Sequence, residues 1–379
     1  MPSVYLGDFP EPDRIDGAPH PRETARLFGH AAAQADYLNS YRQGRAHHAW
    51  LISGPQGIGK ATLAWKIARF LLATPPDDGG MFAPPPPQSL DIPHDHPTAR
   101  RLRALSEPGI FLLRRGLNDK ENAQTQDILV REVRKMTEYF HKTIADGGRR
   151  VCIIDAADDL NPNAANALLK LLEEPPAGVT FLLLSHAPFR LLPTIRSRCR
   201  EMRLAPLNAA DLADALTAAG GIVDAADRVA LAELAGGSVG EAFRLSNSDG
   251  LPLYANLVKT LATLPRLDRP RALALTEIGQ GRAHAPKFDL LVTLLDLFLA
   301  RLARAGTTGT TPPPAAPGES ALIARLSPDP HAARAWADLA QSLGNRARRG
   351  KAVNLDPAAL LMDMVLRIDD TAGVLLAQR

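Results

Sequence analysis

Short runs of apolar residues recur along the first half of the chain and predict buried strands. The runs are HAWLIS (48–53), IFLLR (110–114), VCIID (151–155), VTFLLLS (179–185) and EMRL (201–204). They are apolar on both faces, and helical patterns separate them. This alternation over residues 21–204 is typical of a parallel sheet covered by helices, so we expect an α/β domain with five parallel strands.

Two of the intervening helices have clear sequence signals. In the first, apolar residues recur at spacings of four, three and four: Leu129, Val133, Met136 and Phe140. The second begins at Asn161-Pro162, where an N-cap residue precedes a proline at the first helical position. It continues through NALLKLLEE and is expected to end before the two prolines at 175–176.

After the last strand-like run the pattern becomes helical. Residues 205–246 predict a small helical unit, and residues 251–379 predict a Leu- and Ala-rich helical domain, so the expected fold is α/β followed by all-α. Three segments interrupt the pattern. We expect residues 1–20 to form a flexible arm, the Pro-rich residues 75–97 an insertion, and residues 305–319 a flexible linker.

The composition is that of an ordinary globular protein with two or three domains: 379 residues, 45% hydrophobic and 22% charged, with a net charge of +3. The two cysteines, Cys152 and Cys199, exclude a disulfide framework and a four-cysteine zinc site. The N-terminus has no signal-peptide pattern, and the apolar stretch from Phe288 is too charged to span a bilayer. We therefore expect a cytoplasmic protein without a membrane partner.

The segment GPQGIGKA, between a predicted strand and a predicted helix, is close to a phosphate-binding loop. Such a loop directs backbone N–H groups and a lysine at the phosphates of ATP or ADP. The hydroxyl that normally ligates Mg²⁺ is missing at Ala61, and the next residue lies about 100° further round the helix. The candidate nucleotide-binding residues here are Gly54, Gly57, Gly59, Lys60 and Thr62.

Asp155, at the end of the predicted strand VCIID, fits the role of orienting a metal ion and its waters. Hydrolysing enzymes of this type usually have a glutamate next, but the chain has Ala156. Asp158 and Asp159 are expected to be solvated in the loop. Two apolar replacements in one catalytic machinery predict poor ATP hydrolysis. The loop either still holds nucleotide weakly or is kept only as a structural turn.

Three segments together resemble the AAA+ clamp-loader subunits of bacterial DNA polymerase III. They are RAHHAWLISGPQGIGKATLA, NALLKLLEEPPAGVTFLLLSHAP and LLPTIRSRCREMRLAPL. The resemblance implies an AAA+ domain at 21–204, a helical lid at 205–246 and a helical collar at 251–379. It also implies partners: gamma/tau and delta subunits, and through the complex the sliding clamp and primer-template DNA.

The resemblance assigns roles to individual residues. Arg198, in the Ser-Arg-Cys motif, corresponds to an arginine that reaches into the ATP site of a neighbouring subunit. Ser185 falls at the sensor position after the fourth strand, and Gly240 stands where active members carry a lid arginine. Three catalytic groups are thus missing within the chain (at Ala61, Ala156 and Gly240), while the one acting on a neighbour is present. This pattern suits a non-catalytic stator subunit.

Some alternatives remain open. An active AAA+ ATPase, of the gamma/tau type or a Holliday-junction helicase motor, is the main one, and a P-loop nucleotide kinase is a third. Family members commonly carry a zinc module where this chain has residues 75–97, so we expect no zinc, and His94 and His96 are expected to be solvated. Without the motif, Arg198 reads as part of a basic surface cluster. The run GNRARRGK (344–351) is expected to be a solvated helix end, with DNA contact as the less favoured reading.

Overall fold

The computed structural model describes residues 11, 14–24, 26–74, 85–117, 125–141, 148–221, 224, 227–277 and 285–378. The predicted features at 1–10 and 75–84 lie outside these ranges. The chain forms two compact units, one of Met1–Ile222 with Gly237–Phe243, the other of Val223–Gly236 with Arg244–Arg379.

The first unit contains the predicted five-stranded sheet. Its strands are β1 (Ala49–Ser53), β2 (Ile110–Leu113), β3 (Arg150–Ile154), β4 (Val179–Ser185) and β5 (Arg200–Arg203). All neighbouring pairs are parallel, in the order β2-β3-β4-β1-β5. Each strand lies within one residue of its predicted bounds, so the prediction is confirmed.

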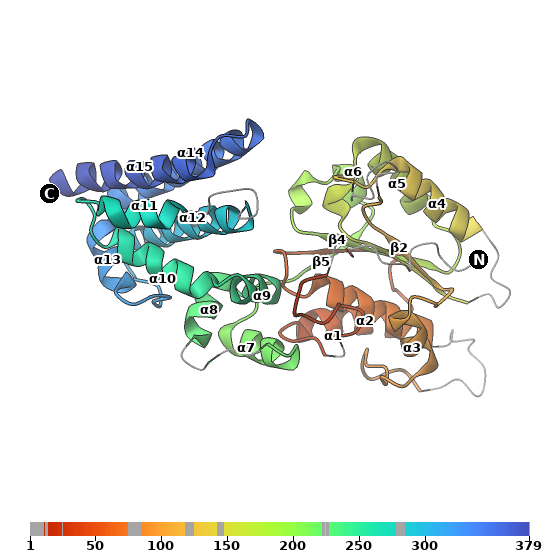
Figure 1. Ribbon diagram of the computed structural model, residues 1–379. Helices are drawn as coiled ribbons and strands as arrows, with labels where there is room; N and C mark the ends of the chain where they lie inside the picture. Colours follow the sequence, from red (N-terminus) through yellow and green to blue (C-terminus); the bar gives the residue numbers. More distant parts are fainter. Residues whose placement is uncertain are drawn as a thin grey trace. The chain divides into compact units, whose positions relative to one another are not determined.

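Helices cover both faces of this sheet (Figure 1). On one face lie α1 (Ala31–Arg42), α2 (Lys60–Ala73) and α3 (Pro97–Arg103); on the other lie α4 (Val130–His141), α5 (Pro162–Glu173) and the short α6 (Pro193–Arg196). The predicted cap of α5 is present, because Asn161 Oδ1 accepts a hydrogen bond from Ala164 N at 2.8 Å. The two helices predicted from sequence are therefore both confirmed.

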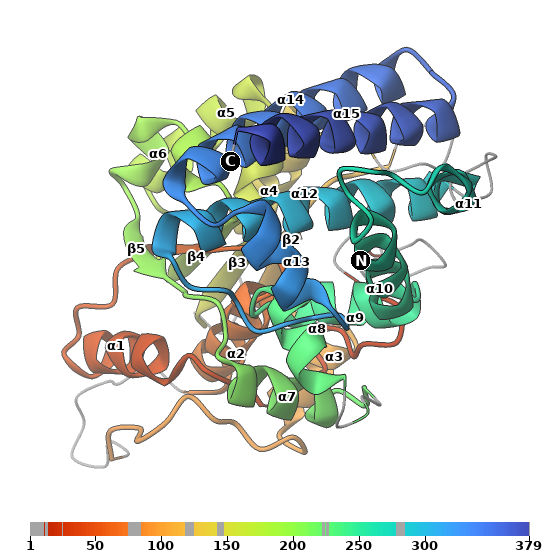
Figure 2. The same cartoon turned by 90° about the vertical axis from the view of Figure 1, so that its left-hand side faces the viewer.

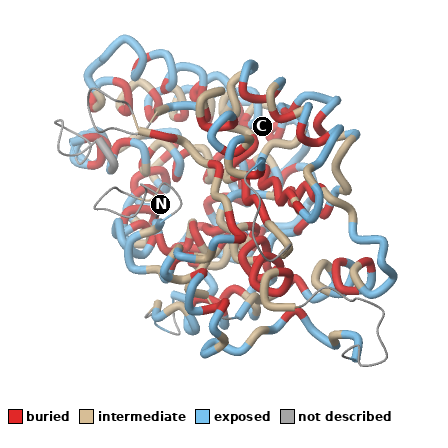
Figure 3. The backbone as a smooth tube through the Cα atoms, turned by 90° about the vertical axis from the view of Figure 1, so that its right-hand side faces the viewer, coloured by how far each residue is buried: buried red, intermediate tan, exposed pale blue. Residues whose placement is uncertain are grey.

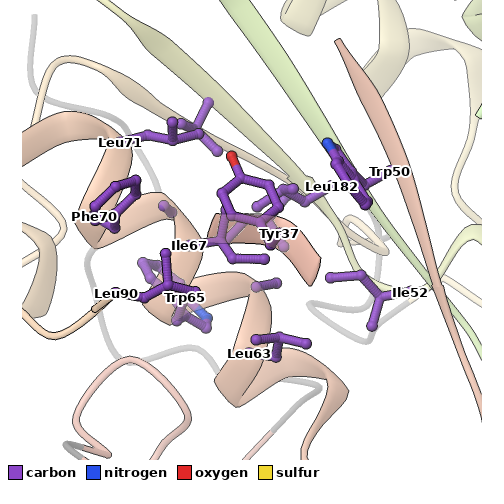
Figure 4. Packing of buried hydrophobic residues seen from close by; sticks show 14 of the residues in the cluster. Tyr37, Trp50, Ile52, Leu63, Trp65, Ile67, Phe70, Leu71, Leu90 and Leu182 are labelled. Atoms are coloured by element: carbon purple, nitrogen blue, oxygen red, sulfur yellow. The ribbon is translucent and has the colours of Figure 1, made fainter. Parts of the chain in front are cut away.

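Successive residues of β1 pack into two separate cores, as the two-residue period of a strand requires. Trp50 and Ile52 join the core beneath α1 and α2 with Tyr37 and Trp65 (Figure 4). Ala49 and Leu51 join the core beneath α4 and α5. With both faces covered, β1 is buried between β4 and β5 and delivers the loop that follows it to a fixed place.

The described part of the second unit is helical, as predicted. Its helices are α8 (Arg228–Ala235), α10 (Gly250–Leu261), α11 (Arg269–Glu277), α12 (Ala285–Thr308), α13 (Glu319–Leu326), α14 (Pro330–Ala352) and α15 (Pro357–Ala377). Helices α14 and α15 lie side by side (Figure 2), and α12 packs against α14. Buried and exposed residues alternate along these helices, which is the pattern of amphipathic helices around a core. Figure 3 colours the backbone by burial.

The region predicted as one helical lid, 205–246, is shared between the units. Helix α7 (Ala209–Ala218) and the start of α9 (Val239–Asn247) belong to the first unit, whereas α8 belongs to the second. Leu207 N donates to Gly237 O at 3.0 Å, which ties the segment before α9 to the first unit.

Two segments predicted to be flexible are packed. His20, in the predicted arm, is completely buried with its ring 6.2 Å from that of Trp65. In the predicted linker 305–319, α12 extends to Thr308 and Glu319 is fully buried. Glu319 accepts hydrogen bonds from Ala315 N at 2.6 Å and from Arg301 Nε at 2.7 Å. Both predictions are wrong for the described residues, because neither contact is visible in the local composition.

No helix among the described residues is long and apolar enough to cross a membrane.

Candidate functional site

The phosphate-loop sequence forms the turn from β1 into α2, as predicted. Gly54, Gly57 and Gly59 all have positive φ values, of 146°, 75° and 105°. At Gly54 a Cβ atom would lie 2.5 Å from Leu204 O, so only glycine fits there. Gly54 N donates to Ser185 O at 3.1 Å, which brings the predicted sensor residue beside the loop.

Five consecutive carbonyl groups of this loop, those of residues 54–58, are all bound by the chain itself. Lys60 Nζ donates to the oxygens of residues 54 and 55 at 2.7 and 2.6 Å. Ser238 Oγ donates to the carbonyl oxygen of residue 56 at 2.9 Å, and Gly240 N donates to the carbonyl oxygen of residue 57 at 3.1 Å. His30 Nε2 lies 2.7 Å from the carbonyl oxygen of residue 58. These contacts stabilise the loop through its carbonyl groups, whereas phosphates bind to backbone N–H groups.

Lys60 is turned into the loop and is only 6% exposed. Burial lowers the pKa of its ammonium group from 10.5 to about 8, although the charges of Asp155 and Asp158 act in the opposite direction. In this position the ammonium group donates to loop carbonyl oxygens. In a nucleotide-bound loop the lysine would donate to phosphate oxygens instead.

The residues that follow Lys60 fit Mg²⁺ poorly. Ala61 packs against the core beneath α1 and α2 and carries no oxygen. Thr62 is half-buried, one residue further along α2. The residues present therefore do not reproduce the metal ligation of a hydrolysing phosphate loop.

Asp155 directly follows β3, and its N donates to Leu113 O at 2.9 Å. The adjacent position, where a catalytic glutamate is usual, is Ala156, which is 4% exposed. Asp155 thus lies at the carboxyl edge of the sheet with Lys60, but no second carboxylate accompanies it at the neighbouring position.

Asp158 is not solvated, contrary to the prediction. Its side chain is 6% exposed and accepts hydrogen bonds from Ser185 Oγ at 2.8 Å, His186 N at 2.7 Å and Ala187 N at 3.2 Å. The hydroxyl at the sensor position is thereby engaged within the chain. Asp159 is partly exposed and faces Arg115, with 3.3 Å between Oδ2 and Nε. The two acids differ because only Asp158 reaches the loop after β4.

Ser238 and the start of α9 lie directly on the phosphate loop, which sequence reasoning missed. A Cβ at Gly57 would lie 2.3 Å from Ser238 Oγ, and a Cβ at Gly240 would lie 3.0 Å from Gly57 Cα and from Ile15 Cδ1. Position 240 is where the family resemblance expects an arginine in active members. The close approach of the two backbones explains why a side chain has no room here.

Arg198 lies in the turn between α6 and β5, where the resemblance places it. Its Nη1 donates to Thr194 O at 3.0 Å, and its Nη2 lies 2.6 Å from Glu173 Oε1 at the end of α5. The arginine side chain is 35% exposed. It is therefore held on the outside of the first unit, where an anion can reach it.

The neighbouring arginines have other contacts. Arg200 binds Asp36 at 2.7 Å and lies over the Trp50 ring, and Arg196 lies over Phe189. Cys199 packs against the core beneath α4 and α5, and burial raises its thiol pKa to about 12, which disfavours a nucleophilic role. This agrees with its interpretation as a packing residue.

The remaining candidates have structural partners. His94 contacts Arg103 Nη1, and His96 Nδ1 caps α3 by accepting from Thr98 N at 3.2 Å. His94 is exposed, as expected, whereas His96 is half-buried and has a structural role as the cap of α3. Over the ranges described above, no three His, Cys, Asp or Glu residues form a group suited to a metal ion.

The basic run 344–351 forms the end of α14, as predicted. Lys351 Nζ lies 2.7 Å from Asp289 Oδ2, and Arg346 Nε lies 2.8 Å from Asp363 Oδ2. Part of its positive charge is therefore balanced within the second unit, and less of it is free for phosphates than the sequence suggests.

Comparisons with known proteins agree with this geometry. A family model described as DNA polymerase III, delta subunit, matches residues 29–208. DNA polymerase III subunit delta' of Pseudomonas aeruginosa is 40% identical over 158 residues, which cover 41% of this chain and 43% of that protein. Subunit delta' of Escherichia coli is 29% identical over 333 residues, covering 87% of this chain and 91% of that protein.

A third relative is DNA polymerase III subunit gamma of Buchnera aphidicola, 28% identical over 194 residues that cover 51% of this chain and 47% of that protein. The chain thus spans less than half of the Pseudomonas aeruginosa and Buchnera relatives, and about nine-tenths of the Escherichia coli one. The match to the Escherichia coli delta' covers enough of the chain to reach the helices of the second unit, where the sequence resemblance is only general. The chain is thus similar to DNA polymerase III delta-prime subunits, by the family model over residues 29–208 and by the Escherichia coli relative over most of its length.

Proposed function

We propose that this chain is the delta-prime stator of a DNA polymerase III clamp loader. It assembles in the cytoplasm with gamma/tau and delta subunits and helps to place the sliding clamp on primed DNA. Its part in ATP hydrolysis is to supply Arg198 to the ATP site of a neighbouring subunit. Similarity to DNA polymerase III delta-prime subunits supports the assembly role.

One observation carries the non-catalytic assignment. Lys60, the lysine that would reach the phosphates of a bound nucleotide, is buried and donates to two carbonyl oxygens of its own loop, while Arg198 is 35% exposed. Ala61 supplies no metal ligand, and Ala156 supplies no base. We propose that the loop binds ATP or ADP weakly or not at all, and that no zinc is needed. Purified protein should not hydrolyse ATP; robust turnover abolished by Lys60→Ala would overturn the assignment.

The role of Arg198 is tested in the reconstituted clamp loader. A guanidinium group at the neighbouring γ-phosphate offsets the charge that develops during phosphoryl transfer. Arg198→Ala should leave assembly intact and lower DNA- and clamp-stimulated ATP turnover. The fall should be smaller than the roughly 10³–10⁵ that arginine fingers contribute per site in GTPases, because the other sites continue to act.

Two further variants sharpen this test. Arg198→Lys should restore little activity, because an ammonium group cannot reproduce the planar fork. Arg196→Ala, four positions before the start of β5, is the matched control and should retain turnover. Wild-type turnover in the Arg198→Ala complex, or an equal loss with Arg196→Ala, would restore the interpretation as a basic surface cluster.

We also propose that the helices from residue 251 onward attach this subunit to its partners. Four exposed positions, Leu366, Asp370, Val374 and Ala377, follow one stripe of α15. Leu366 and Val374 are 40% and 57% exposed. Exposed aliphatic side chains on one helix face are a common feature of subunit contacts.

A further inference from the structure

We propose that Glu173 is a positioning residue that holds Arg198 in the free subunit and must release it when the neighbouring subunit carries ATP. The inference rests on the proposed role of Arg198. It adds a residue of α5 to the site. When Arg198 binds the phosphate of the neighbouring ATP, it exchanges the Glu173 carboxylate for that phosphate.

The geometry of the pair supports an exchange. Arg198 has two separate contacts, Nη1 to Thr194 O at 3.0 Å and Nη2 to Glu173 Oε1 at 2.6 Å. The Thr194 carbonyl belongs to the same turn as Arg198 and orients the guanidinium group locally. Glu173 comes from the end of α5, and its carboxylate neutralises the face of the guanidinium group that an incoming phosphate would need.

The strength of the pair is suited to release. The side chains of Arg198 and Glu173 are 35% and 49% exposed, and ion pairs in such surroundings contribute little because water screens them. A triphosphate carries more negative charge than one carboxylate and can accept several donors. If Glu173 stayed in place, two anions would lie against one guanidinium group and repel each other. The Glu173 carboxylate therefore opposes binding of Arg198 to the phosphate, and removing the charge of Glu173 should favour this binding.

The test compares Glu173→Gln with Glu174→Gln in the full-length chain. Glu174 is the next residue, is also exposed, and ends α5 as its C-cap, so it controls for the loss of one negative charge at the same helix end. The measured quantity is the Kd of this subunit for the gamma/tau ATPase subunit, with and without a non-hydrolysable ATP analogue.

We expect Glu173→Gln to tighten binding by roughly two- to fivefold with the analogue, the range of an exposed ion pair, and to leave the nucleotide-free Kd unchanged. Glu174→Gln should change neither value. In an Arg198→Ala background the effect of Glu173→Gln should disappear, which a purely structural role of Glu173 would not predict. Turnover by the assembled complex should show the gain in kcat/KM for ATP.

The outcomes separate this inference from the proposed function. If Arg198→Ala removes the nucleotide dependence of binding but Glu173→Gln behaves like Glu174→Gln, the holding role is wrong and the trans-acting arginine stands. Weaker binding with Glu173→Gln would show that the carboxylate assists the arginine, which also contradicts the exchange. If Arg198→Ala changes neither binding nor turnover, the proposed function itself fails.

Discussion

A single buried lysine makes the closed phosphate loop sensitive to pH. Burial lowers the pKa of Lys60 to about 8 from 10.5, so the folded state loses this proton at lower pH than the unfolded state. Between these two values the unfolded state binds more protons, and the contribution of Lys60 to stability therefore rises with pH. Below about pH 8 the full cost of burying the charge is present.

Lys60→Met removes the ammonium group while keeping most of the apolar stem. The free energy of unfolding of the wild type, relative to this variant, should increase from pH 7 to pH 10, by up to about 3 kcal/mol at about 1.4 kcal/mol per pKa unit. Urea unfolding at several pH values measures the difference. The exposed Lys170→Met variant controls for the loss of a lysine. A pH-independent difference for Lys60→Met would show that the ammonium group is not held in the loop.

Secondary-structure elements follow from local sequence, whereas contacts between them do not. The strands and α5 were predictable because apolar runs, the Asn161 cap and the prolines after α5 act on neighbouring residues. The role of Asp158 was not, because it depends on the loop after β4, 27 residues further along the chain. Glu173 lies in the segment NALLKLLEEPPAGVTFLLLSHAP, which resembles clamp-loader subunits, but only the fold brings it to Arg198.

The loop between α12 and α13 shows the same limit. Its composition predicts flexibility, yet Glu319 holds it by accepting from Ala315 N, Arg301 Nε and Tyr254 Oη, the last at 2.6 Å. All four residues lie in the second unit. A carboxylate buried in this way is invisible in a sequence pattern because its partners come from three different parts of the chain.

Glu319→Ala should destabilise the protein by about 2–4 kcal/mol, because it leaves Arg301 without its closest buried partner and two backbone N–H groups without an acceptor. Urea unfolding followed by circular dichroism measures the change. Asp289→Ala is the matched control: it removes an ion pair with Lys351 whose side chains are 51% and 61% exposed. We expect that control to cost less than about 1 kcal/mol. Equal losses would contradict the structural role of Glu319.

At the scale of the whole molecule, two units with separate cores divide the proposed work. The first carries the closed loop and Arg198, and the second carries the exposed stripe of α15. The division could be anticipated from the change of pattern after residue 204. The placement of α8 with the second unit could not, because it depends on packing rather than on local helix signals.

The double variant Leu366→Glu/Val374→Glu tests the proposed attachment surface. Both side chains are exposed, so folding should be unchanged, whereas charges on an apolar contact should prevent incorporation into the clamp loader. Co-elution with gamma/tau and delta in size-exclusion chromatography is the measurement, with circular dichroism to confirm folding. Val229→Glu, at an exposed position of α8 outside the proposed attachment helices, is the control. Normal incorporation of the α15 variant would remove α15 from the attachment surface.

The contact between Gly240 and Gly57 has an evolutionary consequence. Replacing Ala61 and Ala156 needs only new side chains, but a Cβ at position 240 meets Gly57 Cα at 3.0 Å. A side chain there therefore requires the backbone at Gly57 to shift by a few tenths of an ångström, directly beside the bond from Gly240 N to Gly57 O. Under the proposed non-catalytic role, the change at position 240 is thus harder to reverse by a single substitution than those at Ala61 and Ala156.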